Sequence, residues 1–348
     1  MFETKVVNGI GDNNFRQYIL QNKNTLFYSE PRFIQLISDH LNCDARWLSI
    51  YKKGSLVGLL PFLLKYGPLG TVLNSLAYFG SNGGVIQAKK DDEAKILLIE
   101  AFYEYARSIK AASATIITNP LENDFLLYDE HSSISFRDER IGQITHFPII
   151  KDKSEIIKYF KDPRPRNIRR AMKEGVIVES GQEKYLDFLF ETHNENMNEI
   201  GGLPKKREFF QKIPKLLNSK DWKIYSAFLD GKPIASLLLF YFNKTIEYFT
   251  PVILKDYRNT QALTLIIYQA MQDGMNSGFK NWNWGGTWLS QGGVYDFKKR
   301  WGTSEYRYYY YTKVLNNKIR YESKSLLEED YSGFYVIPYK YLEKNNNV

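Results

Sequence analysis

The sequence of 348 residues is poor in the residue types that carry redox and metal chemistry. Its single cysteine, Cys43, cannot form an internal disulfide, and its four histidines lack the spacing of a metal site. No run approaches the ~20 apolar residues that a membrane-spanning helix needs, and the N-terminal segment MFETKVVNGIGDN is too polar for a signal peptide. We therefore expect a cytoplasmic protein that binds no metal and is neither a zinc nor a redox enzyme.

Positive charge is in surplus, with a net charge of +8 and an isoelectric point near 9.1. Such a surplus favours anionic partners, namely phosphorylated small molecules, RNA or the surface of a bacterial inner membrane that the protein would contact peripherally. DNA is not expected. The alternative is that the charge serves solubility alone.

The chain is long enough for two domains, and its apolar patterns repeat in one order. The first half predicts a helix at 29–42, a hairpin of strands at 46–51 and 56–64, a helix at 92–110 and a strand at 114–118. The second half predicts a helix at 204–219, strands at 222–229, 234–242 and 245–250, a helix at 261–277 and a strand at 281–284. The pattern indicates a duplicated domain.

Landmark residues of the two copies correspond, with a slowly drifting offset. The pairs are Pro31 with Pro204, Trp47 with Trp222, and Gly54 with Gly231. We predict an α/β (α+β) protein of two tandem domains, each a mixed sheet flanked by helices. The first domain spans 1–150 and the second 151–342, with the boundary in the connector 147–175 and a disordered tail at 343–348.

The segment NWNWGGTWLSQGGVYDFKKRWG, at 281–302, combines tryptophans, paired glycines and a basic cluster. This combination is typical of a pocket wall, although a hairpin with bulky core residues has the same composition. If the end of the segment is a strand with Phe297 facing the core, Lys298 points to the opposite face. There it either neutralises an anion in a groove or is an exposed lysine of an edge strand.

The densest cationic cluster lies at 161–173. Its Arg166, Arg169 and Arg170 share one face at the start of a predicted helix, where guanidinium groups suit phosphate oxygens. The cluster indicates either a phosphate or RNA site or a solvated helix face. His193, Glu195, Glu247 and Asp296 offer acid or base groups, but no partner for them can be identified from the sequence.

Four segments in a fixed order resemble one known family. They are RNIRRAMKEGV from 166, MNEIGGLP from 197, DGKPIASLLLF from 230 and GGTWLSQGGVYDFKKRWG from 285. Together they are similar to the Fem-type peptidoglycan-bridge aminoacyltransferases and their relatives with a BioF2-like acetyltransferase domain, which are built from two tandem GNAT-type (N-acetyltransferase) domains. The resemblance runs through nearly the whole chain. It implies a tandem GNAT fold.

The resemblance also implies a reaction and its site. The reaction is transfer of an acyl or aminoacyl group onto an amine of a cell-envelope glycan precursor, such as a nucleotide- or lipid-diphosphate-linked amino sugar or peptide. Lys298, directly after Phe297, matches the position at the catalytic centre. Arg166, and next to it Arg169, match the contacts to acceptor phosphate. The other expected substrate-binding residues are Phe297, Trp284, Trp288, Gly285 and Gly286.

No tightly bound cofactor is expected, and the donor is acyl-CoA or aminoacyl-tRNA. GNAT enzymes hold the CoA pyrophosphate on a glycine-containing loop at a helix start. Aligning Arg258 with the first position of that loop places Gln261 and Leu263 where glycines are usual, which favours aminoacyl-tRNA. The alternative function is a catalytically inactive GNAT-like scaffold that binds RNA or phosphoglycan.

Overall fold

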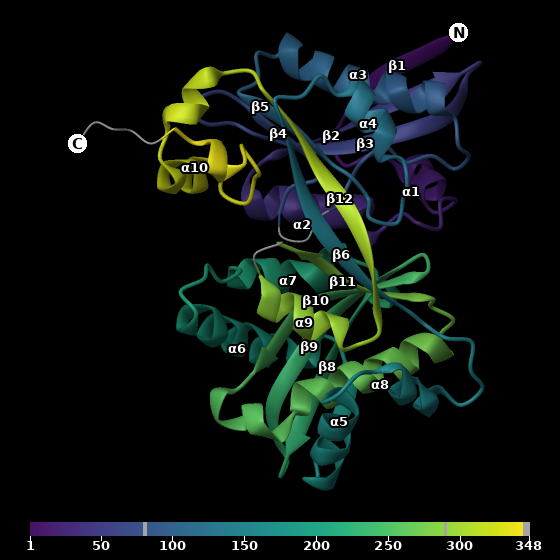
Figure 1. Ribbon diagram of the computed structural model, residues 1–348, viewed down its shortest axis with the longest axis vertical. Helices are drawn as coiled ribbons and strands as arrows, with labels where there is room; N and C mark the ends of the chain where they lie inside the picture. Colours follow the sequence, from purple (N-terminus) through teal and green to yellow (C-terminus); the bar gives the residue numbers. More distant parts are fainter. Residues whose placement is uncertain (79–81, 289–290, 344–348) are drawn as a thin grey trace. The chain divides into compact units, whose positions relative to one another are not determined.

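The computed structural model describes residues 1–78, 82–288 and 291–343. The chain forms two compact units (Figure 1): unit 1 combines Met1–Arg140 with Arg307–Val348, and unit 2 is Ile141–Tyr306. The predicted domains differ from these units, because the segment after 306 was expected in the second domain and belongs to unit 1. The predicted tail lies outside the described residues from 344 onward.

Unit 1 contains a sheet with the strand order β1-β2-β3-β4-β5-β12-β6. Its elements are β1 (Phe2–Asn8), α1 (Asn13–Ile19), α2 (Pro31–Leu41), β2 (Asp44–Lys52), β3 (Ser55–Lys65), β4 (Val72–Ser75), α3 (Asp92–Ser108), β5 (Ser113–Ile117), α4 (Phe125–His131) and α10 (Lys324–Asp330). Two further strands, β6 (Phe136–His146) and β12 (Thr303–Val314), each begin in one unit and end in the other.

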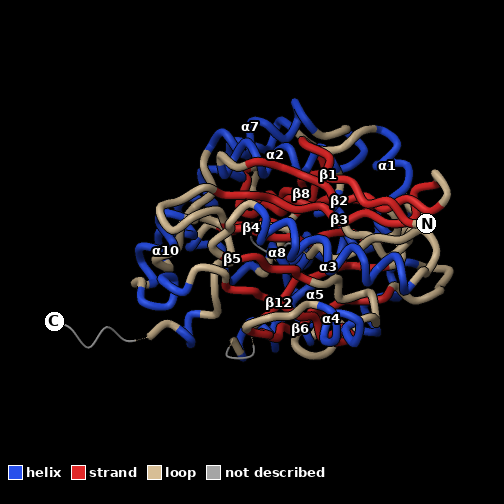
Figure 2. Tube along the Cα trace, turned by 90° about the horizontal axis from the view of Figure 1, so that it is seen from above, coloured by secondary structure: helices blue, strands red, loops and turns tan. Residues whose placement is uncertain are grey.

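Unit 2 contains a sheet with the order β6-β11-β10-β9-β8-β7. Its elements are α5 (Arg164–Lys173), β7 (Ile177–Gly181), α6 (Leu186–Glu199), α7 (Arg207–Leu216), β8 (Trp222–Leu229), β9 (Lys232–Phe242), β10 (Thr245–Ile253), α8 (Ala262–Asn276), β11 (Asn281–Thr287) and α9 (Gly292–Lys299). Figure 2 shows the strands in red and the helices beside them in blue.

The two units repeat one arrangement. The order α2-β2-β3-β4-α3-β5 in unit 1 matches α7-β8-β9-β10-α8-β11 in unit 2. In both, the first two strand pairings are antiparallel and the last is parallel. The predicted mixed α/β fold is therefore confirmed. The prediction lacked β4, whose four residues are too few for a clear alternating pattern.

The core of unit 2 lies between the sheet and α8, which packs on β8, β9 and β10. The apolar residues of α8 join Trp282, Trp284 and Trp301 in one buried cluster. Gly274 lets α8 approach β10, because a Cβ atom at this position would collide with the side chain of Ile246. The close packing fixes the sheet from which the candidate site is built.

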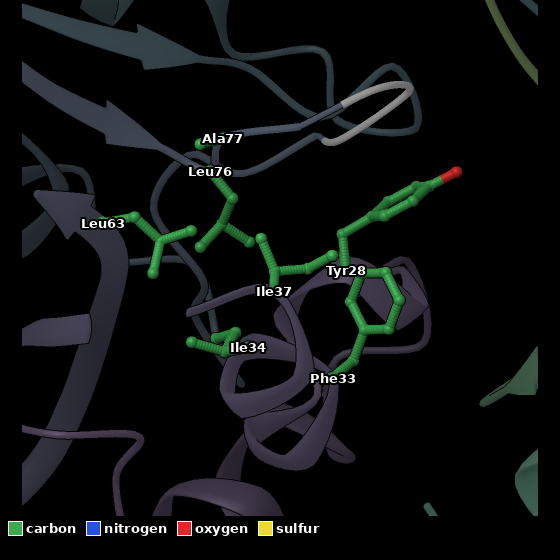
Figure 3. Close-up of a pocket in the computed structure, with 7 residues that line it drawn as sticks. All are labelled: Tyr28, Phe33, Ile34, Ile37, Leu63, Leu76 and Ala77. Atoms are coloured by element: carbon green, nitrogen blue, oxygen red, sulfur yellow. The ribbon is translucent and has the colours of Figure 1, made fainter. Parts of the chain in front are cut away.

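Unit 1 has an apolar recess of about 150 Å³ between α2, β3 and the segment after β4 (Figure 3). It is lined by Tyr28, Phe33, Ile34, Ile37, Leu63, Leu76 and Ala77. The recess leaves no space for a water molecule, so it is part of the packed core rather than a ligand pocket. Across the described ranges, no helix combines the length and apolar character needed to cross a membrane.

Candidate active site

The candidate site lies where β10 and β11 stop pairing. Their parallel ladder has three pairs, the last of which joins Glu247 to Asn283, although β10 continues to Ile253 and β11 to Thr287. Just beyond the last pair, the register of β10 with β9 shifts between Tyr248 and Thr250. Beyond this pair, β10 and β11 no longer pair with one another.

A bulge in β11 follows immediately. Asn283 pairs with Ile144 of β6 and Gly286 pairs with Gly142, so two residues of β11 stand opposite one residue of β6. Gly285 within the bulge has φ +72°, a left-handed conformation that favours glycine. The Asn283 side chain holds the bulge by accepting a 2.9 Å hydrogen bond from the Gly285 amide.

The bulge presents oxygen atoms to Lys298 of α9. Lys298 Nζ donates to the carbonyl oxygens of Gly286 at 3.0 Å and Gly285 at 3.4 Å, and to Thr287 Oγ1 at 2.9 Å. The side chain is 7% exposed. Burial lowers the pKa of Lys298 to about 8, and no ion pair with a described carboxylate opposes this effect. Lys298 can therefore gain and lose its proton near neutral pH.

The segment that carries Lys298 is a helix, which corrects the predicted strand. Strand alternation would place Phe297 and Lys298 on opposite faces. In the helix, Phe297 instead packs at the edge of the apolar cluster of unit 2, while Lys298 reaches the bulge. The signal that sequence reasoning missed is that Val294, Phe297 and Trp301 have helical spacing.

Arg164, the first residue of α5, fixes the end of α9. Its guanidinium lies 4.3 Å from the ring centre of Phe297 and 5.3 Å from that of Trp301, and its Nη2 donates to the Phe297 carbonyl at 3.3 Å. That carbonyl belongs to the last turn of α9, where a cationic donor is favourable. Burial, and then the charge of Arg300, lower the pKa of Arg164 to about 10.

The family comparison bears directly on this unit. Residues 165–299 match the family model of the acetyltransferase (GNAT) domain. The chain contains a GNAT domain. It holds α5 to α9, and with them the separated strands, the bulge and Lys298.

Solved structures extend the likeness beyond the GNAT domain. FemX shares the fold with a TM-score of 0.72 and 16% identity, over 91% of this chain and 98% of FemX. L-PGS from Bacillus licheniformis has a TM-score of 0.55 and 12% identity, over 90% and 94% of the two chains. A protein of unknown function from Bacteroides thetaiotaomicron has a TM-score of 0.57 and 11% identity, over 89% and 100%.

These identities are low, so the three likenesses show the fold alone. No curated protein matches the sequence. The match to the GNAT domain model and the FemX fold agree with the GNAT-type fold that the resemblance implies.

The arginines of α5 differ in how far they are buried. Arg166 and Arg169 lie on the exposed face of α5 together with Arg170, which pairs with Glu174 at 2.7 Å. Arg164, which was not selected, is 8% exposed and points to α9. The distinguishing signal is that Arg164 shares the buried stripe of Ile168 and Ala171.

The predicted tryptophans also differ from one another. Trp284 is 2% exposed, stacks on Trp301 with ring centres 5.5 Å apart, and donates its indole hydrogen to Thr145 Oγ1 at 2.9 Å. Trp288 is 47% exposed and directly precedes residues 289–290, which lie outside the described part. Trp284 thus packs in the core behind the bulge, and Trp288 is open to solvent.

The sequence resemblance aligns the start of α8 with the pyrophosphate loop of ordinary GNAT domains. Gln261 precedes the helix with φ +60°, so it keeps the left-handed backbone that a glycine would adopt. Its side chain accepts a 2.8 Å hydrogen bond from Asn167 of α5, and Arg258 forms an ion pair with Glu199. Side chains that could otherwise face a pyrophosphate are therefore engaged within the domain.

A second lysine of low pKa lies beside β10. Lys205 is placed with its ammonium 5.2 Å from the ring centre of Phe249, at the register shift of β10, and burial lowers its pKa to about 8. Its backbone amide donates to His193 Nε2 at 3.1 Å. Sequence reasoning identified no partner for His193 as an acid or base, and in the structure this hydrogen bond gives it a role in holding the segment before α7.

Proposed function

We propose that this protein transfers an activated acyl or aminoacyl group onto an amine of a cell-envelope glycan precursor. The acceptor is an amino sugar or peptide linked to a nucleotide or lipid diphosphate. The observation that carries the proposal is Lys298, a buried cation of lowered pKa held on three oxygen acceptors beside the separated strands. The GNAT domain and the FemX fold support acyl transfer.

The chemistry needs a fixed cation more than a nucleophile. The neutral acceptor amine attacks the carbonyl carbon of the donor, which forms a C–N bond and places negative charge on the carbonyl oxygen. Lys298 donates a hydrogen bond to that oxyanion. When the C–O or C–S bond of the donor breaks, the nitrogen loses one proton and the leaving group gains one. The amine and the leaving group can exchange this proton between themselves.

The exposed face of α5 supports an acceptor that carries phosphates. Arg166 and Arg169 project from it, and neither has an ion pair among the described residues. Guanidinium groups bind phosphate oxygens in a paired geometry that lysine does not offer. We assign these two arginines to the diphosphate of the acceptor.

The start of α8 supports a donor other than ordinary acetyl-CoA. Gln261 replaces the expected glycine, and its side chain is engaged with Asn167. An aminoacyl ester of tRNA satisfies the same chemistry and needs no pyrophosphate loop. The first experiment must therefore test which donor the protein uses, aminoacyl-tRNA or acyl-CoA.

The experiment pairs each donor with each acceptor and measures product mass. The full chain is incubated with acetyl-CoA or alanyl-tRNA, together with a UDP-linked amino sugar or a UDP-linked muramyl peptide. We expect a product heavier by one acyl or aminoacyl group, and a loss of about a hundredfold or more in Lys298→Ala. A loss of less than about tenfold, or ~1.4 kcal/mol, would remove Lys298 from the centre.

A binding scaffold is the second candidate, favoured by the basic face of α5. It predicts that tRNA or a UDP-sugar raises the melting temperature with no change of mass in any pairing. Turnover in any pairing excludes the scaffold, and binding without turnover excludes the transferase for the substrates tested.

A further inference from the structure

A buried glutamine connects β6, β11 and α9. The side chain of Gln143 is 0% exposed and lies in β6, opposite the bulge of β11. Its Nε2 donates to the Tyr295 carbonyl of α9 at 3.1 Å, and its Oε1 accepts from Thr287 Oγ1 at 3.2 Å. Thr287, 1% exposed, in turn accepts from Lys298 Nζ at 2.9 Å.

The direction of each hydrogen bond in this chain follows from chemistry. The Tyr295 carbonyl can only accept, so the NH₂ group of Gln143 must face it. The amide oxygen of Gln143 then faces Thr287, whose hydroxyl has one hydrogen and gives it to that oxygen. The lone pairs of Thr287 are left to face Lys298, and an ammonium can only donate.

We propose that Gln143 and Thr287 are positioning residues that hold Lys298 Nζ at the bulge with one hydrogen available for a substrate oxygen. The assignment rests on the proposed function only for the role of that hydrogen. Lys298 Nζ donates three hydrogen bonds. The hydrogen bonds to Thr287 Oγ1 and the Gly286 carbonyl are 2.9 and 3.0 Å long, whereas the hydrogen bond to the Gly285 carbonyl is 3.4 Å long. The longest bond is the weakest, so its hydrogen turns most easily to an oxyanion.

Other charged groups lie on the elements around Lys298 but bind elsewhere. On α5, Arg164 contacts Phe297, and on β10, Glu247 accepts from Asn283. On β6, His146 contacts Asn281 and Tyr306. On α9 itself, Lys299 contacts the Tyr295 hydroxyl and Asp296 is exposed. The neutral side chains of Gln143 and Thr287 are therefore the groups to substitute in order to change the surroundings of Lys298 Nζ.

The test measures proton binding at Lys298 itself. The folded full chain is labelled with trace acetic anhydride between pH 6 and 10, and mass spectrometry follows the modification of Lys298. We expect Thr287→Val to lower the midpoint by about one pH unit, because it removes an acceptor for the charged form. Gln143→Glu is expected to raise the midpoint, because it places a carboxylate behind Thr287.

Matched variants separate positioning from general damage. Thr287→Ser keeps the hydroxyl and should keep the wild-type midpoint, and if Thr287→Val does not fold, the shift expected in Gln143→Glu alone tests the proposal. Thr312→Val removes another buried hydroxyl, which bonds to Thr115 in unit 1, and should leave Lys298 unchanged. Unmoved midpoints in folded Thr287→Val and Gln143→Glu overturn the proposal.

Kinetic measurements test whether Thr287 affects turnover through Lys298. With a pairing that turns over, Thr287→Val should lower kcat with little change in KM, and it should add no further loss to Lys298→Ala. A further loss of kcat in the double variant of Thr287→Val and Lys298→Ala would show that Thr287 does not act through Lys298. If no pairing turns over, the proposed function fails for the substrates tested, while the labelling midpoints still decide whether Gln143 and Thr287 hold Lys298.

Discussion

The side-chain amide of Asn283 donates a 2.8 Å hydrogen bond to the Glu247 carboxylate, and both side chains are buried. This bond joins the last paired positions of β10 and β11. The oxygen of the same amide accepts from the Gly285 backbone. One side chain therefore fixes both the point where the strands separate and the bulge that presents carbonyl oxygens to Lys298.

Replacing Asn283 with aspartate should destabilise unit 2 by about 2–4 kcal/mol. Asn283→Asp keeps an acceptor for the Gly285 amide but puts an oxygen against the buried Glu247 carboxylate, so either two charges repel or one must be neutralised. Urea unfolding followed by tryptophan fluorescence measures the loss.

Asn281→Asp provides the control for this substitution. Two residues earlier in β11, its side chain contacts His146 rather than a carboxylate, so we expect a loss below about 1 kcal/mol. Equal losses in the two variants would show that contact with Glu247 is not the reason for the instability.

Local sequence patterns were sufficient for the repeated part of the fold. The helical stripe of α8 and the paired strands β8 and β9 are determined by neighbours in the chain, so their pattern is visible in the sequence. The matching landmarks of the first half then predicted a second mixed sheet. The predicted order is confirmed because each copy buries its apolar residues by the same pairings.

Long-range pairings were not predictable in the same way. β12 pairs with β5 across nearly two hundred residues, and no local pattern shows that a strand after Trp301 returns to unit 1. The candidate site has the same limit. Gln143 and Arg164 reach α9 only through the fold, whereas the prediction of Lys298 came from a family resemblance.

The activity should depend on pH through Lys298. The ammonium is the form that stabilises an oxyanion, and it is lost as the pH rises through a pKa of about 8. We therefore expect kcat/KM, which rises at first as the acceptor amine deprotonates, to fall above about pH 8. Initial rates between pH 6 and 10 test this with any pairing that turns over.

Lys299→Ala serves as the control for the pH profile, because Lys299 is exposed and contacts Tyr295 rather than the bulge. It should keep the fall above about pH 8. Rates that continue to rise up to pH 10 in the wild type would instead indicate that neutral Lys298 acts, as a base.

The exposed arginines of α5 should affect binding of the acceptor rather than the chemical step. Arg166→Ala and Arg169→Ala are each expected to raise the KM of a diphosphate-linked acceptor about tenfold at low salt, with less effect at high salt and little change in kcat. Arg170→Ala is the matched control on the same face, because Arg170 already pairs with Glu174. An equal rise in KM for all three would indicate a general effect of charge.

His193 should make unit 2 sensitive to acid. It is 5% exposed, its Nε2 accepts from the Lys205 amide, and burial followed by the charge of Lys205 lowers its pKa to about 4 from 6.5. The folded state thus favours neutral His193, while the unfolded state binds a proton below about pH 6.5. The stability that His193 provides above pH 6.5 is lost as the pH falls towards 4, by about 3 kcal/mol.

His193→Gln tests this linkage because glutamine does not titrate. The difference in unfolding free energy between wild type and His193→Gln should shift by about 3 kcal/mol in favour of the variant between pH 7 and pH 4. Five of the six tryptophans lie in unit 2, so their fluorescence reports its unfolding. His131→Gln removes a histidine from unit 1 and should leave this transition unchanged. A difference that stays constant with pH would mean that His193 gains a proton as readily in the folded chain as in the unfolded one.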